Sequence, residues 1–318
     1  MIRHIPRLLR GALLENCLKF YAGEIGAVDN LRLLQNSLKV GKIDPETKLK
    51  IRTQDQFGFE WKKWPRLPSF AENHFFHVLG TSQEFLLGKV GWDPAVGMGR
   101  DLFNACQSVG EKGFMVGSDL SFAVDQTYER CKEFDNVLII QADLFDSFLE
   151  HSSFDFIYMI GLIQHLTNPA LGVRHVCQRL KPGGSFIGTI YERPTDFLVG
   201  LVIGTVCLVR PLTTKIPFEF LYLLAKCFAL PAYLFFSLPD FLLRRFKYVQ
   251  NMRTIYPGHG TTEGRPDLEL LTHAWFDHFS PPIARFFKKA EGRALFATPE
   301  LEVHFFENGF VRGTRPLT

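Results

Sequence analysis

The chain has 318 residues, 46% of them apolar, which is ample for the packed core of one large domain or of a domain with an appendage. Its net charge of +3 at pH 7 comes without a concentrated basic stripe, which excludes nucleic acid as an expected partner. The six cysteines show no pairing pattern and predict a reducing compartment, so we expect a cytoplasmic protein. No ligand spacing recurs among the histidines, cysteines and carboxylates, so we predict no metal site.

Residues 1–50 contain no recognisable motif. Residues 1–17 are basic and intermittently apolar, without an apolar run of about 7–15 residues or a small-residue cleavage site, so we expect no signal peptide. The interpretation for residues 1–52 is an N-terminal arm that packs over the core, with a surface or partner helix as the alternative.

The most informative segment begins at Lys89 with a short strand pattern that ends at Asp93. A turn with Gly97 and Gly99 and a helical pattern follow, and together they form a device that brings backbone N–H groups close to a ligand. The next predicted strand ends at Asp119, twenty residues after Gly99, where a ribose-binding carboxylate lies in a doubly wound sheet. These features predict a cofactor that contains adenosine.

Three more buried-strand patterns follow, over residues 136–143, 154–160 and 185–191. They alternate with helical stretches, which is typical of a parallel sheet whose crossovers place all carboxyl ends along one edge. We therefore predict an α/β fold with a doubly wound, mostly parallel sheet. We expect four residues to lie along that edge, namely Ala95, Asp119, Asp143 and Gly161.

The stretch 195–265 after the fifth strand is unusually apolar and predicts a helical insertion. Its two apolar runs, 197–209 and 217–239, are each too short or too interrupted for the roughly 20 residues of a membrane-spanning helix. One interpretation is a set of helices packed on the core or on a second subunit. The other is a cap that shapes a lipophilic acceptor pocket or touches a membrane through residues 197–248. Nothing in the sequence fixes the oligomeric state.

The order and spacing of these motifs resemble the class I S-adenosylmethionine-dependent methyltransferases. The resemblance rests on residues 88–192, and residues 53–61, 275–281 and 298–310 look like flanking segments of one bacterial branch of that family. It implies a Rossmann-like methyltransferase core over 53–194, the insertion over 195–265 and the C-terminal part of the fold over 266–318. It further implies S-adenosylmethionine as cofactor and methyl transfer to an acceptor that the sequence does not identify.

The resemblance also assigns the methionine end of the cofactor. Asp93 would contact its amino group, Arg100 its carboxylate, and Ile160 and Gly161 would let this end pass the fourth predicted strand. The turn from Ala95 through Gly97 and Gly99 would approach the cofactor closely. Ala95 stands where the family usually has a glycine, and its methyl group narrows this approach.

At the nucleoside end, Asp119 would accept both ribose hydroxyls, since a carboxylate offers two acceptor oxygens. Leu120 would flank the adenine. Asp143 would accept the adenine amino group between Ala142 and Leu144. The alternatives are structural, with Asp119 and Asp143 as N-caps of the segments that follow them.

Three residues are candidates for a general base, namely His165, Tyr191 and His278. Phe57 and Trp61 are expected either to close over the cofactor or to pack in the core. The predicted function is methyl transfer to a small, lipophilic acceptor, and the alternative is a non-catalytic subunit or scaffold with this fold. Because the sequence stops soon after residue 310, the presence of the last strand of the sheet is left open.

Overall fold

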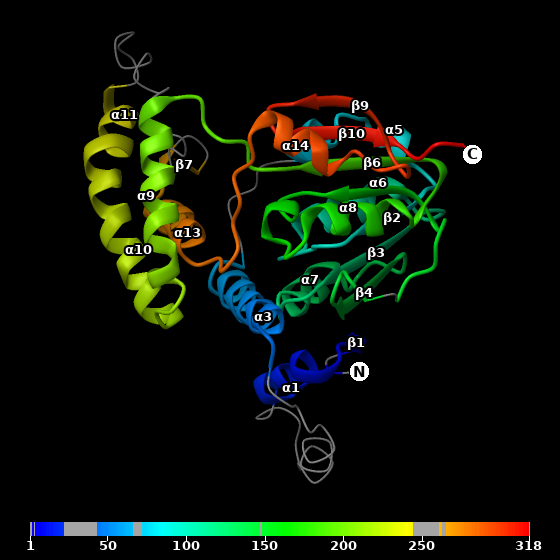
Figure 1. Ribbon diagram of the computed structural model, residues 1–318, viewed down its shortest axis with the longest axis horizontal. Helices are drawn as coiled ribbons and strands as arrows, with labels where there is room; N and C mark the ends of the chain where they lie inside the picture. Colours follow the sequence, from blue (N-terminus) through cyan, green and yellow to red (C-terminus); the bar gives the residue numbers. More distant parts are fainter. Residues whose placement is uncertain are drawn as a thin grey trace. The chain divides into compact units, whose positions relative to one another are not determined.

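The computed structural model describes residues 2, 4–21, 43–65, 72–146, 148–243, 261–262 and 265–317. The chain forms two compact units (Figure 1). The sheet unit comprises Met1–Lys62, Ala71–Glu192 and Ile283–Thr318. The helical unit comprises Lys63–Phe70 and Arg193–Pro282.

The sheet unit is built on a mixed sheet that has eight strands within the described residues, in the order β1-β4-β3-β2-β5-β6-β10-β9. Neighbouring strands from β1 to β6 run parallel, whereas β10 is antiparallel to both β6 and β9. This confirms the predicted fold class. The strands are β1 (Arg7–Leu8), β2 (Val90–Asp93), β3 (Phe114–Asp119), β4 (Val137–Ala142), β5 (Phe154–Met159), β6 (Leu180–Thr189), β9 (Glu302–Glu307) and β10 (Phe310–Thr314).

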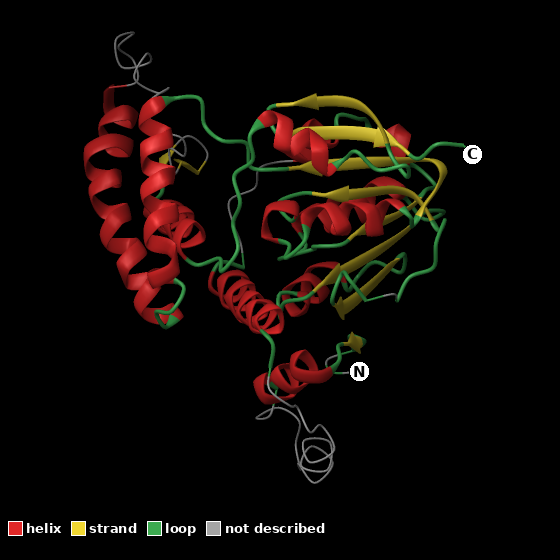
Figure 2. Ribbon diagram, in the orientation of Figure 1, coloured by secondary structure: helices red, strands yellow, loops and turns green. Residues whose placement is uncertain are grey.

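Helices cover both faces of this sheet (Figure 2). Successive strand residues point to opposite faces, so Met115 packs in one apolar cluster and Val116 in the other. Burial on both faces explains why the strands read as continuous apolar runs. The helical segments are α1 (Gly11–Phe20), α3 (Pro45–Lys63), α4 (Glu72–Leu79), α5 (Gln83–Leu86), α6 (Arg100–Val109), α7 (Val124–Cys131), η1 (Ile163–His165), α8 (Pro169–Cys177) and α14 (Lys289–Leu295).

The N-terminal segment does more than pack over the core, because it adds strand β1 to the sheet beside β4. Arg7 donates hydrogen bonds to Gln141 at 2.8 Å and to Asp125 at 2.5 Å, and the Tyr21 hydroxyl donates to Asp125 at 2.6 Å. Helix α3 begins at Pro45 and runs through the predicted boundary at residue 52. The segment is thus part of the sheet unit.

The far edge of the sheet, which the sequence left open, is formed by β10 and β9. Strand β10 pairs with β6 from Phe310↔Thr189 to Thr314↔Ser185. The last strand of the fold is therefore present.

The helical unit follows β6 in the sequence, as the predicted insertion does, but it extends to Pro282. Helix α13 was expected in the C-terminal part of the methyltransferase-like fold. It lies in the helical unit instead, where Phe228 of α10 stacks near Trp275 of α13 with ring centroids 5.4 Å apart. The elements of this unit are α9 (Phe197–Thr213), α10 (Phe218–Ala232), the π-helical turn η2 (Tyr233–Ser237), α11 (Leu238–Leu243), β7 (Thr261–Thr262), β8 (Arg265–Pro266) and α13 (Leu268–Phe279).

Glu300, just before β9, ties that edge of the sheet unit to α8. Its carboxylate accepts hydrogen bonds from Arg174 Nε at 3.1 Å, from Gln178 Nε2 at 3.2 Å and from the Thr298 hydroxyl. Burial alone would raise the pKa of Glu300, but these donors outweigh it and lower the pKa to about 2. A pKa that is lower in the folded than in the unfolded chain stabilises the fold above the unfolded pKa, and this stability is lost as the pH falls.

We therefore expect Glu300→Gln to lower the free energy of unfolding by about 1–3 kcal/mol at pH 7. This loss should shrink as the pH falls from the ordinary glutamate value of 4.5 towards 2. Urea unfolding at pH 7 and at about pH 3 measures both effects, with the exposed Glu302→Gln as the matched control. An equal loss at the two pH values would contradict this account of Glu300.

Candidate active site

The turn after β2 is shaped by two glycines with left-handed backbone angles, Gly97 at φ +50° and Gly99 at φ +79°. The Gly99 N–H donates to the Val96 carbonyl at 2.7 Å, and Gly99 directly precedes helix α6. A Cβ at Gly99 would lie 2.9 Å from the Thr127 Cα. The turn therefore needs glycine here, and it presents the start of α6 at the carboxyl edge of the sheet.

Asp119, at the end of β3, is bound directly to this turn. Its Oδ2 accepts the Gly97 N–H at 2.9 Å and its Oδ1 accepts the Ser121 N–H at 2.7 Å. Each carboxylate oxygen thus keeps lone-pair capacity for one further donor, which fits a pair of adjacent hydroxyls. Burial raises the pKa of Asp119, and the hydrogen bonds from Ser121 and Gly97 offset this only in part.

Asp93, at the end of β2, is buried, and its Oδ1 accepts the Ala95 N–H at 3.1 Å. Burial, reinforced by the nearby Asp101 carboxylate, raises the pKa of Asp93 well above its usual range. A cationic amino group placed beside Asp93 would favour its ionised form. Arg100 pairs with the neighbouring Asp101, with Nε to Oδ1 at 2.9 Å.

Helix α3 lies across this edge of the sheet and contacts the segments that follow several strands. Lys50 Nζ of α3 forms an ion pair at 2.7 Å with Oδ2 of Asp143, which follows β4. The indole nitrogen of Trp61 in α3 lies close to Gly97, which follows β2, because a Cβ on Gly97 would be 3.2 Å from it. A Cβ on Gly58 would lie 2.8 Å from the Phe122 ring after β3. The helix is thus placed where it can cover a bound cofactor.

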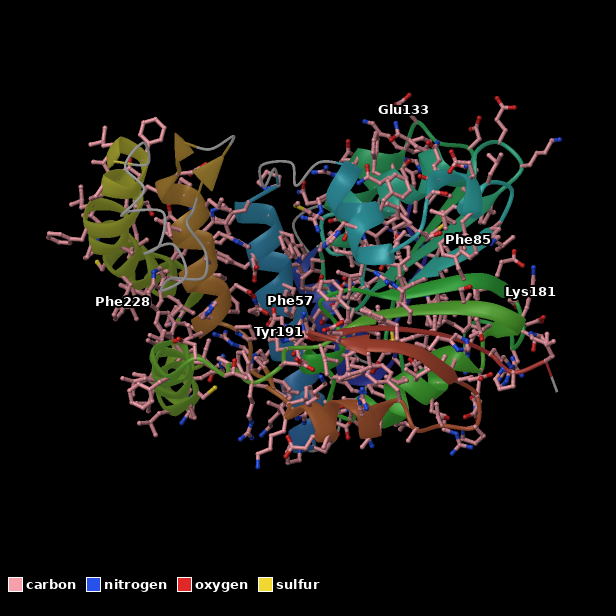
Figure 3. The ribbon with its side chains drawn as sticks, turned by 90° about the horizontal axis from the view of Figure 1, so that it is seen from above. Phe57, Phe85, Glu133, Lys181, Tyr191 and Phe228 are labelled. Carbon is pink, nitrogen blue, oxygen red and sulfur yellow. The ribbon has the colours of Figure 1, made fainter. Side chains whose placement is uncertain are left out.

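The structure places two of the three candidate bases together. The His165 ring lies 5.3 Å from the Phe57 ring and 5.7 Å from the Tyr191 ring (centroid distances; Figure 3 labels the two flanking residues). His165 Nδ1 donates to the Ile283 carbonyl at 2.6 Å, because a carbonyl only accepts. This tautomer places the basic lone pair on Nε2. His278 belongs to α13 of the helical unit, where its Nδ1 contacts the Ala274 carbonyl at 2.8 Å.

Comparison with known proteins identifies this arrangement. Residues 92–188, from β2 into β6, match the family described as "Methyltransferase domain". The chain carries a methyltransferase domain. S-adenosylmethionine is the cofactor of this domain, and the domain makes the chain an enzyme. The resemblance, the enzyme class and the cofactor predicted from the sequence are thereby confirmed.

Solved structures with a similar fold have low sequence identity. A SAM dependent methyltransferase from Aquifex aeolicus is 21% identical, with 49% of this chain and 77% of that one covered and a TM-score of 0.35. One from Mesorhizobium loti is 23% identical, covering 39% and 55%, with a TM-score of 0.34. An arsenic(III) S-adenosylmethionine methyltransferase from Chlamydomonas reinhardtii is 24% identical, covering 37% and 45%, with a TM-score of 0.32. The chain spans about half the length of the last two. No curated protein matches the sequence.

In the methyltransferase domain, the remaining predicted cofactor contacts lie at strand ends. Gly161 follows Ile160 at the end of β5, with φ +70° and its N–H donating to the Thr189 hydroxyl at 2.9 Å. Ala142 and Leu144 are buried in the apolar cluster on one face of the sheet. Leu120 is half-buried beside Asp119. The roles assigned to these residues stay predictions.

Asp143 does not cap a helix, since residues 144–146 form a turn. Its Oδ1 accepts the Phe145 N–H at 3.1 Å, and its Oδ2 faces Lys50. Burial alone would lower the pKa of Lys50, but the Asp143 carboxylate outweighs it and raises the pKa. The contact between Lys50 and Asp143 is not predictable from the sequence, because no spacing relates two residues that are 93 positions apart.

Gln164 was also missed. Its side chain is fully buried beside His165, and within the described part of the chain neither its Oε1 nor its Nε2 has a hydrogen-bond partner. Leaving such a buried amide group without a hydrogen bond costs about 1–3 kcal/mol. Its position directly after β5, on the ligand edge, was the available clue.

Proposed function

We propose that the methyltransferase domain methylates a small, lipophilic acceptor. The proposal is carried by the sheet unit, which holds both the Asp119 carboxylate at the end of β3 and the aromatic rings of Phe57 and Tyr191 around His165. The acceptor itself is defined here only by its chemical class.

The residues at the edge fit S-adenosylmethionine. The two Asp119 oxygens can receive the ribose hydroxyls while they hold the Gly97 and Ser121 N–H groups. Asp93 can receive the amino group of the methionine part. When bound, the cofactor supplies an electrophilic methyl group on a sulfonium. The protein then contributes position and electrostatics, and correct orientation alone can lower a barrier by about 7–11 kcal/mol.

An apolar acceptor is supported by the rings around His165. The Phe57 and Tyr191 rings each meet the imidazole edge to face, and the Phe286 and Tyr191 ring centroids are 5.4 Å apart. The chain leaves for the helical unit after Glu192 and returns at Ile283, whose carbonyl binds His165.

Proton removal from an oxygen or nitrogen acceptor is assigned to His165. The Ile283 carbonyl fixes its Nδ1–H, so Nε2 is the atom that takes the proton. An acceptor whose polar head carries this proton and whose body is apolar fits His165 and the rings around it.

The test is transfer of label from methyl-tritiated S-adenosylmethionine to a total lipid extract, followed by solvent partition. We expect label in the organic phase with the wild-type chain and none with Asp119→Asn. Label that stays in water-soluble products or in protein would contradict a lipophilic acceptor.

A further inference from the structure

The outer surfaces of helices α9 and α10 are apolar although they are exposed. The side chains of Leu208 in α9 and Phe220 in α10 are 79% and 66% exposed, and Phe197, Leu201 and Leu223 are exposed as well. Isolated exposed leucines are ordinary on protein surfaces, but large contiguous apolar surfaces mark an interaction with another apolar body.

The charged side chains of these helices avoid this surface. Between residues 197 and 239 the sequence has four charged residues. Arg210 is buried and donates to the His278 carbonyl of α13 at 3.1 Å, and Lys226 Nζ pairs with Glu269 of α13 at 3.1 Å. The other two, Lys215 and Glu219, lie at the turn between α9 and α10. The helical unit thus directs charge towards α13 and apolar side chains towards its surroundings.

From Phe197 to Val209, helix α9 carries no charged side chain on any side. Among its described side chains from Phe197 to Val209, only Val206 is buried. A Cβ added at Gly200 or Gly204 would meet no atom within 4 Å, so these sides are open too. A helix that is apolar all round belongs in an apolar medium. A two-fold dimer would cover one face of α9, whereas lipid covers every exposed side.

We propose that the helical unit binds a lipid bilayer by inserting the outer surfaces of α9 and α10 into one leaflet. By length and composition the stretch Phe218–Phe235 could cross a membrane, with a mean hydropathy of 1.5 and 22% of it buried. Insertion without crossing fits better, because Arg210 and Lys226 interrupt both helices and are held by α13, which carries Glu269, His273, Asp277 and His278. The inference concerns the helical unit alone and does not depend on the proposed acceptor.

The experiment is co-sedimentation of the full chain with neutral phosphatidylcholine vesicles. Leu201→Glu combined with Leu208→Glu places two charges on one side of α9, two helical turns apart. The matched control combines Leu87→Glu and Leu317→Glu, which are 66% and 81% exposed in the sheet unit. We expect the wild type to sediment, the α9 variant to bind at least about tenfold more weakly, and the control to stay within about twofold.

Thermal unfolding shows whether each variant is folded. If a double variant is not folded, its two substitutions are tested singly. A wild type that stays in the supernatant, or equal binding by both variants, would overturn the proposal. A dimer in sedimentation equilibrium that the α9 variant dissociates would assign the surface to a second copy instead. If the chain binds vesicles but methylates no lipid, membrane binding by the helical unit is supported while the proposed lipophilic acceptor is contradicted.

Discussion

Asp119→Asn is expected to weaken S-adenosylmethionine binding by at least about 100-fold, measured by calorimetric titration. The substitution removes a charged acceptor of two hydroxyls, and hydrogen bonds to charged groups contribute about 1.5–3 kcal/mol each. It also places an amide N–H₂ group opposite the N–H of Gly97 or of Ser121, both of which donate to the carboxylate. Both changes weaken the binding of the cofactor and leave the distant core unchanged.

Asp155→Asn is the matched control. Asp155 lies near the start of β5, where it accepts the Val90 N–H at 2.8 Å and pairs with Lys181, away from the carboxyl ends of the strands. We expect its affinity for S-adenosylmethionine to stay within about twofold of the wild type. Because burial raises the pKa of Asp119, wild-type binding should weaken as the pH falls through that raised pKa. Equal affinities for Asp119→Asn and the wild type would show that Asp119 does not bind the ribose.

Gly99→Ala is expected to lower the free energy of unfolding by about 2–4 kcal/mol and to impair cofactor binding in the chains that remain folded. Two effects add: an alanine at φ +79° is strained, and its Cβ would lie 2.9 Å from the Thr127 Cα, a backbone atom that cannot turn aside. Urea unfolding measures the stability, and calorimetry measures the affinity.

Gly88→Ala separates strain from steric conflict. Gly88 has a similar angle, φ +72°, but a Cβ there would meet no atom within 4 Å. We expect this variant to lose only about 1 kcal/mol and to keep its affinity for S-adenosylmethionine. If both glycine variants lost the same stability, the contact with Thr127 would not be what restricts position 99 to glycine.

The central strands were predictable because their information is local. Strand β3 ends at Asp119, as the acid at the end of its apolar run predicted. The glycine turn after β2 was equally visible, since only glycine adopts its backbone angles freely. The direct hydrogen bond from Gly97 to Asp119 follows from two neighbouring parallel strands ending at the same edge.

Features that depend on distant contacts were not predictable. Strand β1 has two residues, too few for any periodic pattern, and only its pairing with β4 defines it. Helix α13 reads like a continuation of the methyltransferase fold, but its apolar side faces α10, a relation that no local pattern encodes. The pairing of Lys50 with Asp143, and the Gln164 amide that has no partner among the described residues, likewise appear only when the chain is folded.

Hydrogen exchange of the full chain, with and without S-adenosylhomocysteine, tests the central claim most directly, because it reports binding and its location together. We predict slower exchange in peptides that cover residues 93–101 and 119–123, and unchanged exchange in α9 and α10. Unchanged exchange at the sheet edge, or protection confined to the helical unit, would contradict the assignment of the cofactor site to the carboxyl ends of β2 and β3.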